Sequence, residues 1–251
     1  MKRSLSIIGF GSFGRFMAGH LRDHFEVAVC DRVNVEDLAK AAGVRPASLT
    51  EAARAEIIVL CVPVQHLAGL LTEVGPLIAS RAATGDRVVV DVSSVKLKPV
   101  EMMLNMLPPD VGIIGTHPLF GPQSGKDGIA GLPIALCPAR AHSATIEEVR
   151  GFLGQTLRLR VVDVSPDEHD RQMAYVQGLT HLLSRALGEM MLPQTPLATM
   201  AYERLLAMRS NLQHDSWELF LTIERENPYA ADVRSLFDRT LAQIEQRLKG
   251  S

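Results

Sequence analysis

The sequence predicts an α/β protein whose N-terminal part is a doubly wound sheet and whose C-terminal part is helical. Over the first two-thirds of the 251 residues, short and almost continuously apolar runs alternate with helical patterns. Buried parallel strands joined by helices have this pattern. From Ser165 onward the pattern is helical almost to the end, with no strand-like alternation. We therefore predict two domains, residues 1–164 and residues 165–251.

The expected strands are runs of mostly apolar residues, and helical patterns fill the intervals between them. In order, strands are expected at residues 5–8, 26–30, 57–62, 87–92, 111–115, 132–137 and 157–162. Helices are expected at residues 13–23, 35–42, 64–80, 96–106 and 144–154. This alternation is typical of a parallel sheet with helices on both faces.

A helix start marks the beginning of the second domain. Ser165 can cap this helix, Pro166 suits its first position, and Glu168 completes a capping box. Interruptions of the helical pattern are expected at residues 193–196 and 227–228, which contain prolines.

Composition and charge exclude several classes of function. The net charge is −2 and no basic run is present, which argues against nucleic acid or an anionic membrane as a partner. The apolar runs are too short to span a bilayer. Cys30, Cys61 and Cys137 are widely spaced in apolar runs, so we expect reduced thiols and a cytoplasmic protein. His169 and Asp170 lack further ligands at suitable spacing, so we expect no metal.

A glycine motif, G-x-G-x-x-G, follows the first expected strand and opens a helical pattern. In a Rossmann-type sheet its glycines allow a tight turn, approach of the backbone to a pyrophosphate, and close packing of helix on strand. The helix N-terminus then favours the phosphate charge. The alternative is a glycine turn without a ligand. We expect a dinucleotide to bind at Gly9, Phe10, Gly11, Ser12, Phe13 and Gly14.

An acidic residue at the end of the second strand indicates which dinucleotide binds. Asp31 lies 17 residues after Gly14, where a carboxylate holds the ribose 2′-hydroxyl of NAD. Arg32, its neighbour, could instead accept the 2′-phosphate of NADP. Because Asp31 would repel that phosphate, we favour NAD, with NADP as the alternative.

Two further segments follow expected strands and should face the same crevice. Val62 and Pro63 end the third strand, and we expect them to touch the cofactor. Ser93 and Ser94 precede a helix, so one of them is expected to cap it while the other hydroxyl binds substrate or the nicotinamide amide. Lys96 either holds an anion or is solvated.

The segment at residues 115–125 holds one titratable side chain, His117, in a turn that contains two prolines and further glycines. A histidine at the end of a strand is well placed for proton transfer beside a cofactor. The alternative is a surface loop whose histidine only ends the strand.

The first helix of the second domain carries a polar stripe among apolar residues. Such a stripe faces solvent, another helix or a cleft. His181 lies among apolar neighbours, where a histidine with a purely structural role is a competing interpretation. The stripe consists of Asp170, Gln177, Thr180, His181 and Ser184.

Together these motifs resemble the prephenate/arogenate dehydrogenases of tyrosine biosynthesis. The resemblance rests on the ordered set of the glycine motif, D-V-S-S-V-K at residues 91–96, T-H-P-L-F-G-P at residues 116–122, and H-D-R-Q-M-A at residues 169–174 running into V-Q-G-L-T-H at residues 176–181. The H-P-x-F-G-P and H-D-x-x-M-A elements are quite specific, whereas the glycine motif is not.

The resemblance implies an NAD(P)-dependent oxidative decarboxylation. His117 matches the catalytic histidine that deprotonates the ring hydroxyl of the substrate, and Ser94 matches a serine that helps hold that hydroxyl. His181 matches a histidine on the substrate side, where Gln177 and Thr180 are also expected. The family's helical domain forms a homodimer interface, so we expect a homodimer.

One departure concerns the substrate. Some relatives that prefer prephenate carry an arginine at the position of Thr180, so this sequence leaves both arogenate and prephenate open. Two rival functions make different demands on the sequence. Another two-domain dehydrogenase, of the β-hydroxyacid type, would need a lysine on the first helix of the second domain, and residues 165–192 contain none. A dinucleotide-binding sensor without turnover would be indifferent to His117.

Overall fold

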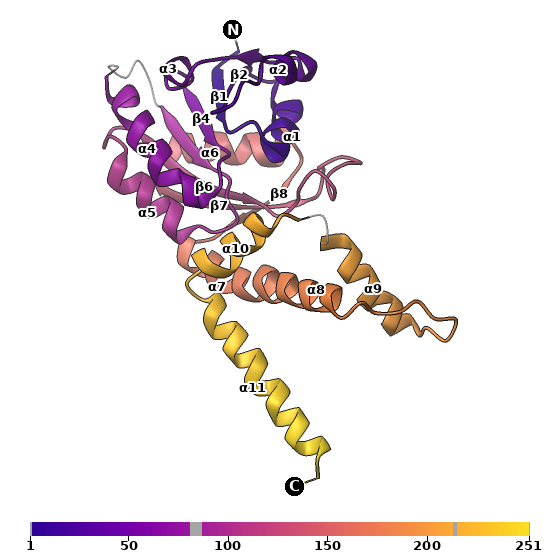
Figure 1. Ribbon diagram of the computed structural model, residues 1–251. Helices are drawn as coiled ribbons and strands as arrows, with labels where there is room; N and C mark the ends of the chain where they lie inside the picture. The colour runs from indigo at the N-terminus through magenta and orange to yellow at the C-terminus, as the bar shows by residue number, and fades with distance from the viewer. Residues whose placement is uncertain (1, 81–86, 213–214, 251) are drawn as a thin grey trace. The chain divides into compact units, whose positions relative to one another are not determined.

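The computed structural model describes residues 2–80, 87–212 and 215–250 (Figure 1). The chain forms two compact units, Met1–His169 and Asp170–Ser251. The division lies inside the first helix after Ser165, whereas the sequence placed a boundary before that residue.

The first unit is built on an eight-stranded sheet within the described residues, with the order β3-β2-β1-β4-β5-β6-β7-β8. The chain first adds strands on one side of β1 and then returns to its other side, so the order reverses between β1 and β4. This confirms the doubly wound, mostly parallel sheet. The strands are β1 (Ser4–Ile8), β2 (Glu26–Cys30), β3 (Arg45–Pro46), β4 (Ile57–Leu60), β5 (Val88–Asp91), β6 (Gly112–Pro118), β7 (Pro133–Arg140) and β8 (Arg160–Asp163).

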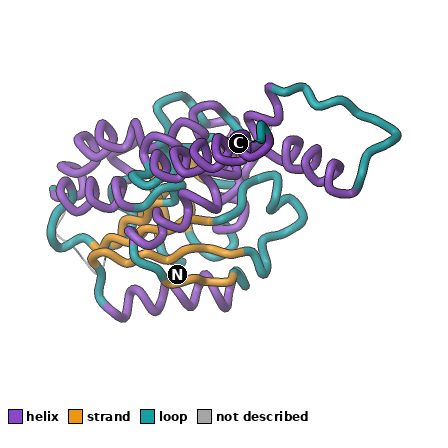
Figure 2. The backbone as a smooth tube through the Cα atoms, turned by 90° about the horizontal axis from the view of Figure 1, so that it is seen from below, coloured by secondary structure: helices purple, strands orange, loops and turns teal. Residues whose placement is uncertain are grey.

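Helices cover both faces of this sheet (Figures 1 and 2). Side chains of α1, α2 and η1 belong to one apolar cluster, and side chains of α3, α4 and α5 belong to a second. The helices are α1 (Ser12–Leu21), α2 (Glu36–Ala42), α3 (Leu49–Ala52), α4 (Val64–Ala79), α5 (Leu97–Met106), α6 (Ser143–Gly151) and the π-helical turn η1 (Phe152–Thr156).

The central strands are largely apolar because their successive side chains enter opposite clusters. Val88 and Val90 of β5 face one cluster, whereas Val89 faces the other. In β6, Ile114 faces the first of these clusters and Ile113 faces the second. A strand buried on both faces has no polar side, which explains the continuous apolar runs of the sequence.

Three features differ from the sequence prediction. Strand β7 is antiparallel to β6. The segment between them contains no helix, and a parallel return normally needs a crossover helix. The short elements β3 and α3 were not predicted. Strand β8 begins at Arg160 rather than at residue 157, because Leu157 closes η1 and Arg158 has a φ of +56°.

The described part of the second unit contains helices and no strand. Helix α7 (Pro166–Met173) begins in the first unit and continues without a break through the π-helical segment η2 (Ala174–Leu179) into α8 (Thr180–Glu189). Ser165 caps this helix, because its hydroxyl accepts a hydrogen bond from Glu168 N at 3.2 Å. The other helices are α9 (Met200–Leu212), α10 (Trp217–Glu226) and α11 (Ala230–Leu248). Within the described residues, no helix is long and apolar enough to cross a membrane.

The glycines of α1 and its preceding turn should differ sharply in their tolerance of alanine. A Cβ at Gly14 would lie 2.1 Å from Gly9 O, whereas a Cβ at Gly19 would meet no atom within 4 Å. We expect Gly14→Ala to lower the free energy of unfolding by about 2 kcal/mol or more, because the helix must move off the strand. Gly19→Ala, the matched control, should raise it by about 0.5–1 kcal/mol. Urea unfolding measures both, and equal stability of the two variants would contradict the close packing at Gly14.

Candidate active site

The carboxyl ends of five strands share one edge of the sheet. Cys30 pairs with Ile8, Ile8 with Leu60, Leu60 with Asp91, and Asp91 with Gly115, so these residues form one row across the sheet. The residues that follow them all leave at this edge, on either side of the point where the strand order reverses. In an open α/β sheet this is the place where ligands bind.

In the glycine turn after β1, a side chain would clash with neighbouring atoms at two of the glycines but not at the third. Gly9 has a φ of +101°, and a Cβ there would lie 2.4 Å from Cys61 O. Gly14 packs against Gly9 O, as described above. A Cβ at Gly11, in contrast, would meet nothing within 4 Å. Gly9 and Gly14 therefore serve the fold, and Gly11 leaves room for a ligand to reach the backbone.

The other residues of this turn divide between core and surface. Phe10 is buried in the core, so the turn can offer its backbone but not its ring. Ser12 is exposed at the first position of α1, and Gly11 at the N-cap provides no side-chain cap. Phe13 is half-buried and packs beside Phe16, with ring centroids 6.1 Å apart. The uncapped helix N-terminus fits the negative charge of a phosphate.

Asp31 lies directly beside the glycine turn. Its Oδ2 atom accepts a hydrogen bond from Phe10 N at 2.6 Å, so the carboxylate also holds the turn in place. Arg32 is exposed. Val62 is next to Gly9, since a Cβ on Gly9 would lie 3.1 Å from Val62 Cγ1. Pro63 is exposed and provides the N-cap position of α4.

A buried ion pair links the ends of β5 and β6. Lys96 is fully buried, and its ammonium group pairs with Asp91 Oδ2. The same group donates to Thr116 O at 2.6 Å, and Thr116 Oγ1 donates to Asp91 O at 2.8 Å. Lys96 is therefore not solvated: the anion that it holds is the carboxylate of Asp91.

The two serines between Asp91 and Lys96 have different surroundings. Ser93 donates to Asp91 Oδ1 from its hydroxyl at 2.7 Å and from its backbone N at 3.0 Å. Ser94 is half-buried, and its hydroxyl forms no hydrogen bond with the residues that the structure describes. The expectation that one serine caps the next helix is wrong, because α5 begins after Lys96 without a side-chain cap.

His117 lies two residues beyond the row, at the end of β6, and contacts a second histidine. Its Nδ1 atom is 2.9 Å from Nε2 of His169, and the rings meet edge to face with centroids 5.1 Å apart. Both side chains are buried. Burial lowers the pKa of His117 well below its ordinary value of 6.5, and the nearby His169 and Lys96 lower it further. These surroundings favour the neutral form of the imidazole.

Three of the expected substrate residues lie in the second unit, on η2 and the start of α8. Gln177 Oε1 is buried without a hydrogen-bond partner among the described residues. Thr180 Oγ1 donates to Val176 O at 2.7 Å. His181 is buried, with Nδ1 3.8 Å from Asp215 Oδ2. Burial lowers the pKa of His181, against the raising effect of Asp215. A π-helical segment often marks a functional position, and Gln177 lies within one.

The contact of His169 with His117 was not predicted. In the sequence, His169 stood out as a metal ligand, which was rejected, and as the first residue of the H-D-x-x-M-A element, which was the signal that this residue matters. Among the described residues, no group of three or more His, Cys, Asp or Glu side chains is arranged to hold a metal ion.

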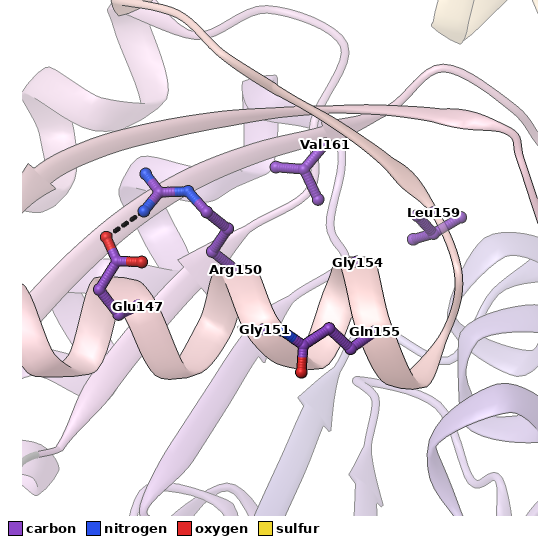
Figure 3. Close-up of a pocket in the computed structure, with 7 residues that line it drawn as sticks. All are labelled: Glu147, Arg150, Gly151, Gly154, Gln155, Leu159 and Val161. Carbon is purple, nitrogen blue, oxygen red and sulfur yellow. Dashed lines mark hydrogen bonds and ion pairs between the residues drawn. The ribbon is translucent and has the colours of Figure 1, made fainter.

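A separate hollow of about 270 Å³ lies between α6, η1 and β8 (Figure 3). Its lining includes none of the residues at the carboxyl edge described above. Arg150 pairs there with Glu147, and also with Asp163 at 2.6 Å, so its charge is already balanced. Nothing in this hollow marks a ligand.

Comparison with known proteins identifies the family. Residues 18–158 match the family model described as "Prephenate dehydrogenase, nucleotide-binding domain". The chain is also 30% identical to arogenate dehydrogenase 2, chloroplastic, of Arabidopsis thaliana, over 98% of this chain and 70% of that protein. The chain belongs to the prephenate/arogenate dehydrogenase family. The predicted class, an NAD(P)-dependent oxidoreductase, is thereby confirmed.

Other similarities agree with this family. Arogenate dehydrogenase 1, chloroplastic, of the same plant is 31% identical over 98% of this chain, but the chain spans only 39% of its length. A solved structure of prephenate dehydrogenase from A. aeolicus has a TM-score of 0.75 and 18% identity, covering 99% of this chain and 91% of that one, which shows the shared fold. Residues 186–251 match a second family model, "TYRAAT1-like, C-terminal domain".

The lowered pKa of His117 should make the protein less stable in mild acid. The unfolded imidazole takes up a proton below about pH 6.5, but the folded one does so only at lower pH. The unfolded state therefore binds more protons in this range, and the free energy of unfolding falls as the pH falls. We expect His117→Asn to reduce the dependence of the unfolding free energy on pH below pH 6.5. Part of the dependence should remain in the variant, because the pKa of His181 is lowered as well. Urea unfolding at several pH values measures the slope, and an unchanged slope in His117→Asn would contradict a neutral buried His117.

Proposed function

We propose that this protein catalyses the NAD-dependent oxidative decarboxylation of arogenate or prephenate, with His117 as the catalytic base. The observation that carries the proposal is a buried imidazole at the same sheet edge as the glycine turn, where burial lowers the pKa of the ring. A general base must be largely unprotonated to work, and the surroundings of His117 meet that requirement.

The chain has the groups needed to hold the cofactor. The open position at Gly11 and the uncapped start of α1 fit a pyrophosphate, and the carboxylate of Asp31 fits a ribose hydroxyl. When bound, the nicotinamide would accept the hydride from the ring carbon that bears the hydroxyl. Val62, Pro63 and Ser93 are proposed to lie against the cofactor.

His117 accounts for the proton in this reaction. As the hydride leaves the ring carbon, the hydroxyl oxygen forms a double bond to that carbon, and its proton moves to the imidazole of His117. The bond from the ring to the carboxylate then breaks, and its electron pair makes the ring aromatic as carbon dioxide leaves. The proton returns from His117 to the oxygen, which becomes a phenol. His117 thus ends the cycle neutral.

Ser94 is proposed to hold the same hydroxyl, because its own hydroxyl has no partner among the described residues. Gln177, Thr180 and His181 are proposed to bind the rest of the substrate. Thr180 occupies the position where some prephenate-preferring relatives carry arginine, and the two Arabidopsis relatives are named arogenate dehydrogenases. Arogenate is therefore the first substrate to test.

The assembly and location of the protein are also proposals. We propose a homodimer through the helical unit, supported by exposed apolar side chains on α11, namely Leu236, Leu241, Ile244 and Leu248. The cytoplasmic location expected from the sequence stays a prediction.

His117→Asn should keep cofactor affinity but lower turnover by about 10²- to 10⁴-fold, because asparagine cannot accept the hydroxyl proton. The measurement is reduced-cofactor formation with purified protein, crossing NAD and NADP with arogenate and prephenate. Unchanged turnover in the variant would remove His117 from the chemistry. Cofactor binding without turnover in the wild type would favour a sensor or another dehydrogenase.

Asp31 should determine the preference for NAD. We expect Asp31→Ala to weaken NAD more than NADP, because the lost carboxylate binds a ribose hydroxyl but repels a 2′-phosphate. The variant also loses the acceptor for Phe10 N. Asp31→Asn is the matched control, since it keeps an acceptor for the turn and removes only the charge. Titration of both cofactors measures the ratio of affinities, and an unchanged ratio in both variants would show that Asp31 is not the ribose ligand.

A further inference from the structure

The contact between His117 and His169 restricts where the protons of both rings lie. The two nitrogens, His117 Nδ1 and His169 Nε2, are 2.9 Å apart, a normal hydrogen-bond distance. The two rings lie edge to face and are buried, so water does not compete for the bond. A hydrogen bond between two neutral imidazoles needs one donor and one acceptor.

The two possible arrangements have opposite consequences for His117. If Nδ1 of His117 donates to His169, then Nε2 of His117 carries a lone pair. If Nδ1 accepts, Nε2 must carry the proton and cannot accept another. Nε2 of His117 forms no hydrogen bond with the residues that the structure describes, so the ring's other nitrogen faces no competing partner there.

We propose that His169 is a positioning residue that holds His117 as the Nδ1–H tautomer, with Nε2 as the base. This inference rests on the proposed function, because it assigns the atom that takes the substrate proton. It gives His169 the orienting role that a carboxylate has in a Ser-His-Asp triad, but with an imidazole nitrogen as the acceptor.

An acceptor without a negative charge suits a base that must return its proton. A carboxylate beside His117 would stabilise the imidazolium and raise its pKa. The titratable or charged groups that influence His117 are instead His169 and Lys96, and the charge of Lys96 is paired with Asp91. The imidazolium is therefore favoured by neither neighbour. When His117 takes the substrate proton, Nδ1–H still donates to His169, so the pair needs no rearrangement.

The tautomer can be measured without any turnover. Protein labelled with ¹⁵N-histidine is examined by long-range ¹⁵N–¹H NMR near neutral pH, alone and with NAD, and His117→Asn assigns the signals. We expect Nδ1 of His117 to be protonated and Nε2 to be unprotonated. A protonated Nε2 in the wild type would overturn the inference even if the enzyme is active.

Three variants of His169 separate positioning from structure. His169→Gln keeps a group that can accept from Nδ1–H, whereas His169→Leu removes it with little change of volume. We expect His169→Leu to lower kcat by about 100-fold or more and His169→Gln to recover most of it, with NAD affinity unchanged in both. His169→Glu places a carboxylate beside His117, so the acid limb of the pH–rate profile should move to higher pH.

The outcomes distinguish this inference from the proposed function. If the wild type turns over but His169→Leu is equally fast, or if the acid limb of His169→Glu does not move, the positioning role is wrong and the function stands. If the wild type turns over no substrate, the proposed function fails, while the NMR result still decides the tautomer. Equal losses in His169→Leu and His169→Gln with equal losses of stability would indicate a merely structural residue.

Discussion

The buried ion pair of Lys96 with Asp91 is the interaction on which the site depends. A lysine that is fully removed from water must have a counter-charge, and Asp91 supplies it. Because Lys96 also binds Thr116 O, the pair joins the ends of β5 and β6 one residue before His117. Asp91 further holds the turn at Ser93, so one carboxylate orders the segment that follows β5 and, through Lys96, the end of β6.

The same arrangement affects the protonation of His117 as well as the position of the strand ends. The ion pair places a cation near His117, and burial removes the water that would stabilise an imidazolium. Both effects favour the neutral base. On the other side of the point where the strand order reverses, Asp31 holds the backbone of the glycine turn. The same carboxylate is the one that we propose to bind a ribose. Two acidic residues, Asp31 and Asp91, thus organise this edge of the sheet through contacts with other groups of the protein.

Much of the fold followed from the sequence because buried parallel strands have no polar face and therefore stand out as apolar runs. The antiparallel β7 did not follow, since strand direction depends on the connection and not on the strand's own residues. The glycine turn and His117 could be found because their motifs are local. The burial of Lys96 and the contact of His117 with His169, 52 residues apart in the chain, could not be found, because each depends on tertiary packing. The π-helical segment η2 was hidden for a related reason: a shift of one residue in period is too small to detect in a short pattern.

The loop that follows His117 packs against the helix of the glycine turn. Phe120 is buried beside Phe16 of α1, with ring centroids 6.3 Å apart, and a Cβ at Gly125 would lie 2.6 Å from Phe16 Cζ. The loop that follows His117 and the helix that follows the glycine turn therefore belong to one packed cluster. For protein engineering, this means that the two segments are not independent targets: a substitution at Phe16 of α1 would also change the packing of the loop that follows His117.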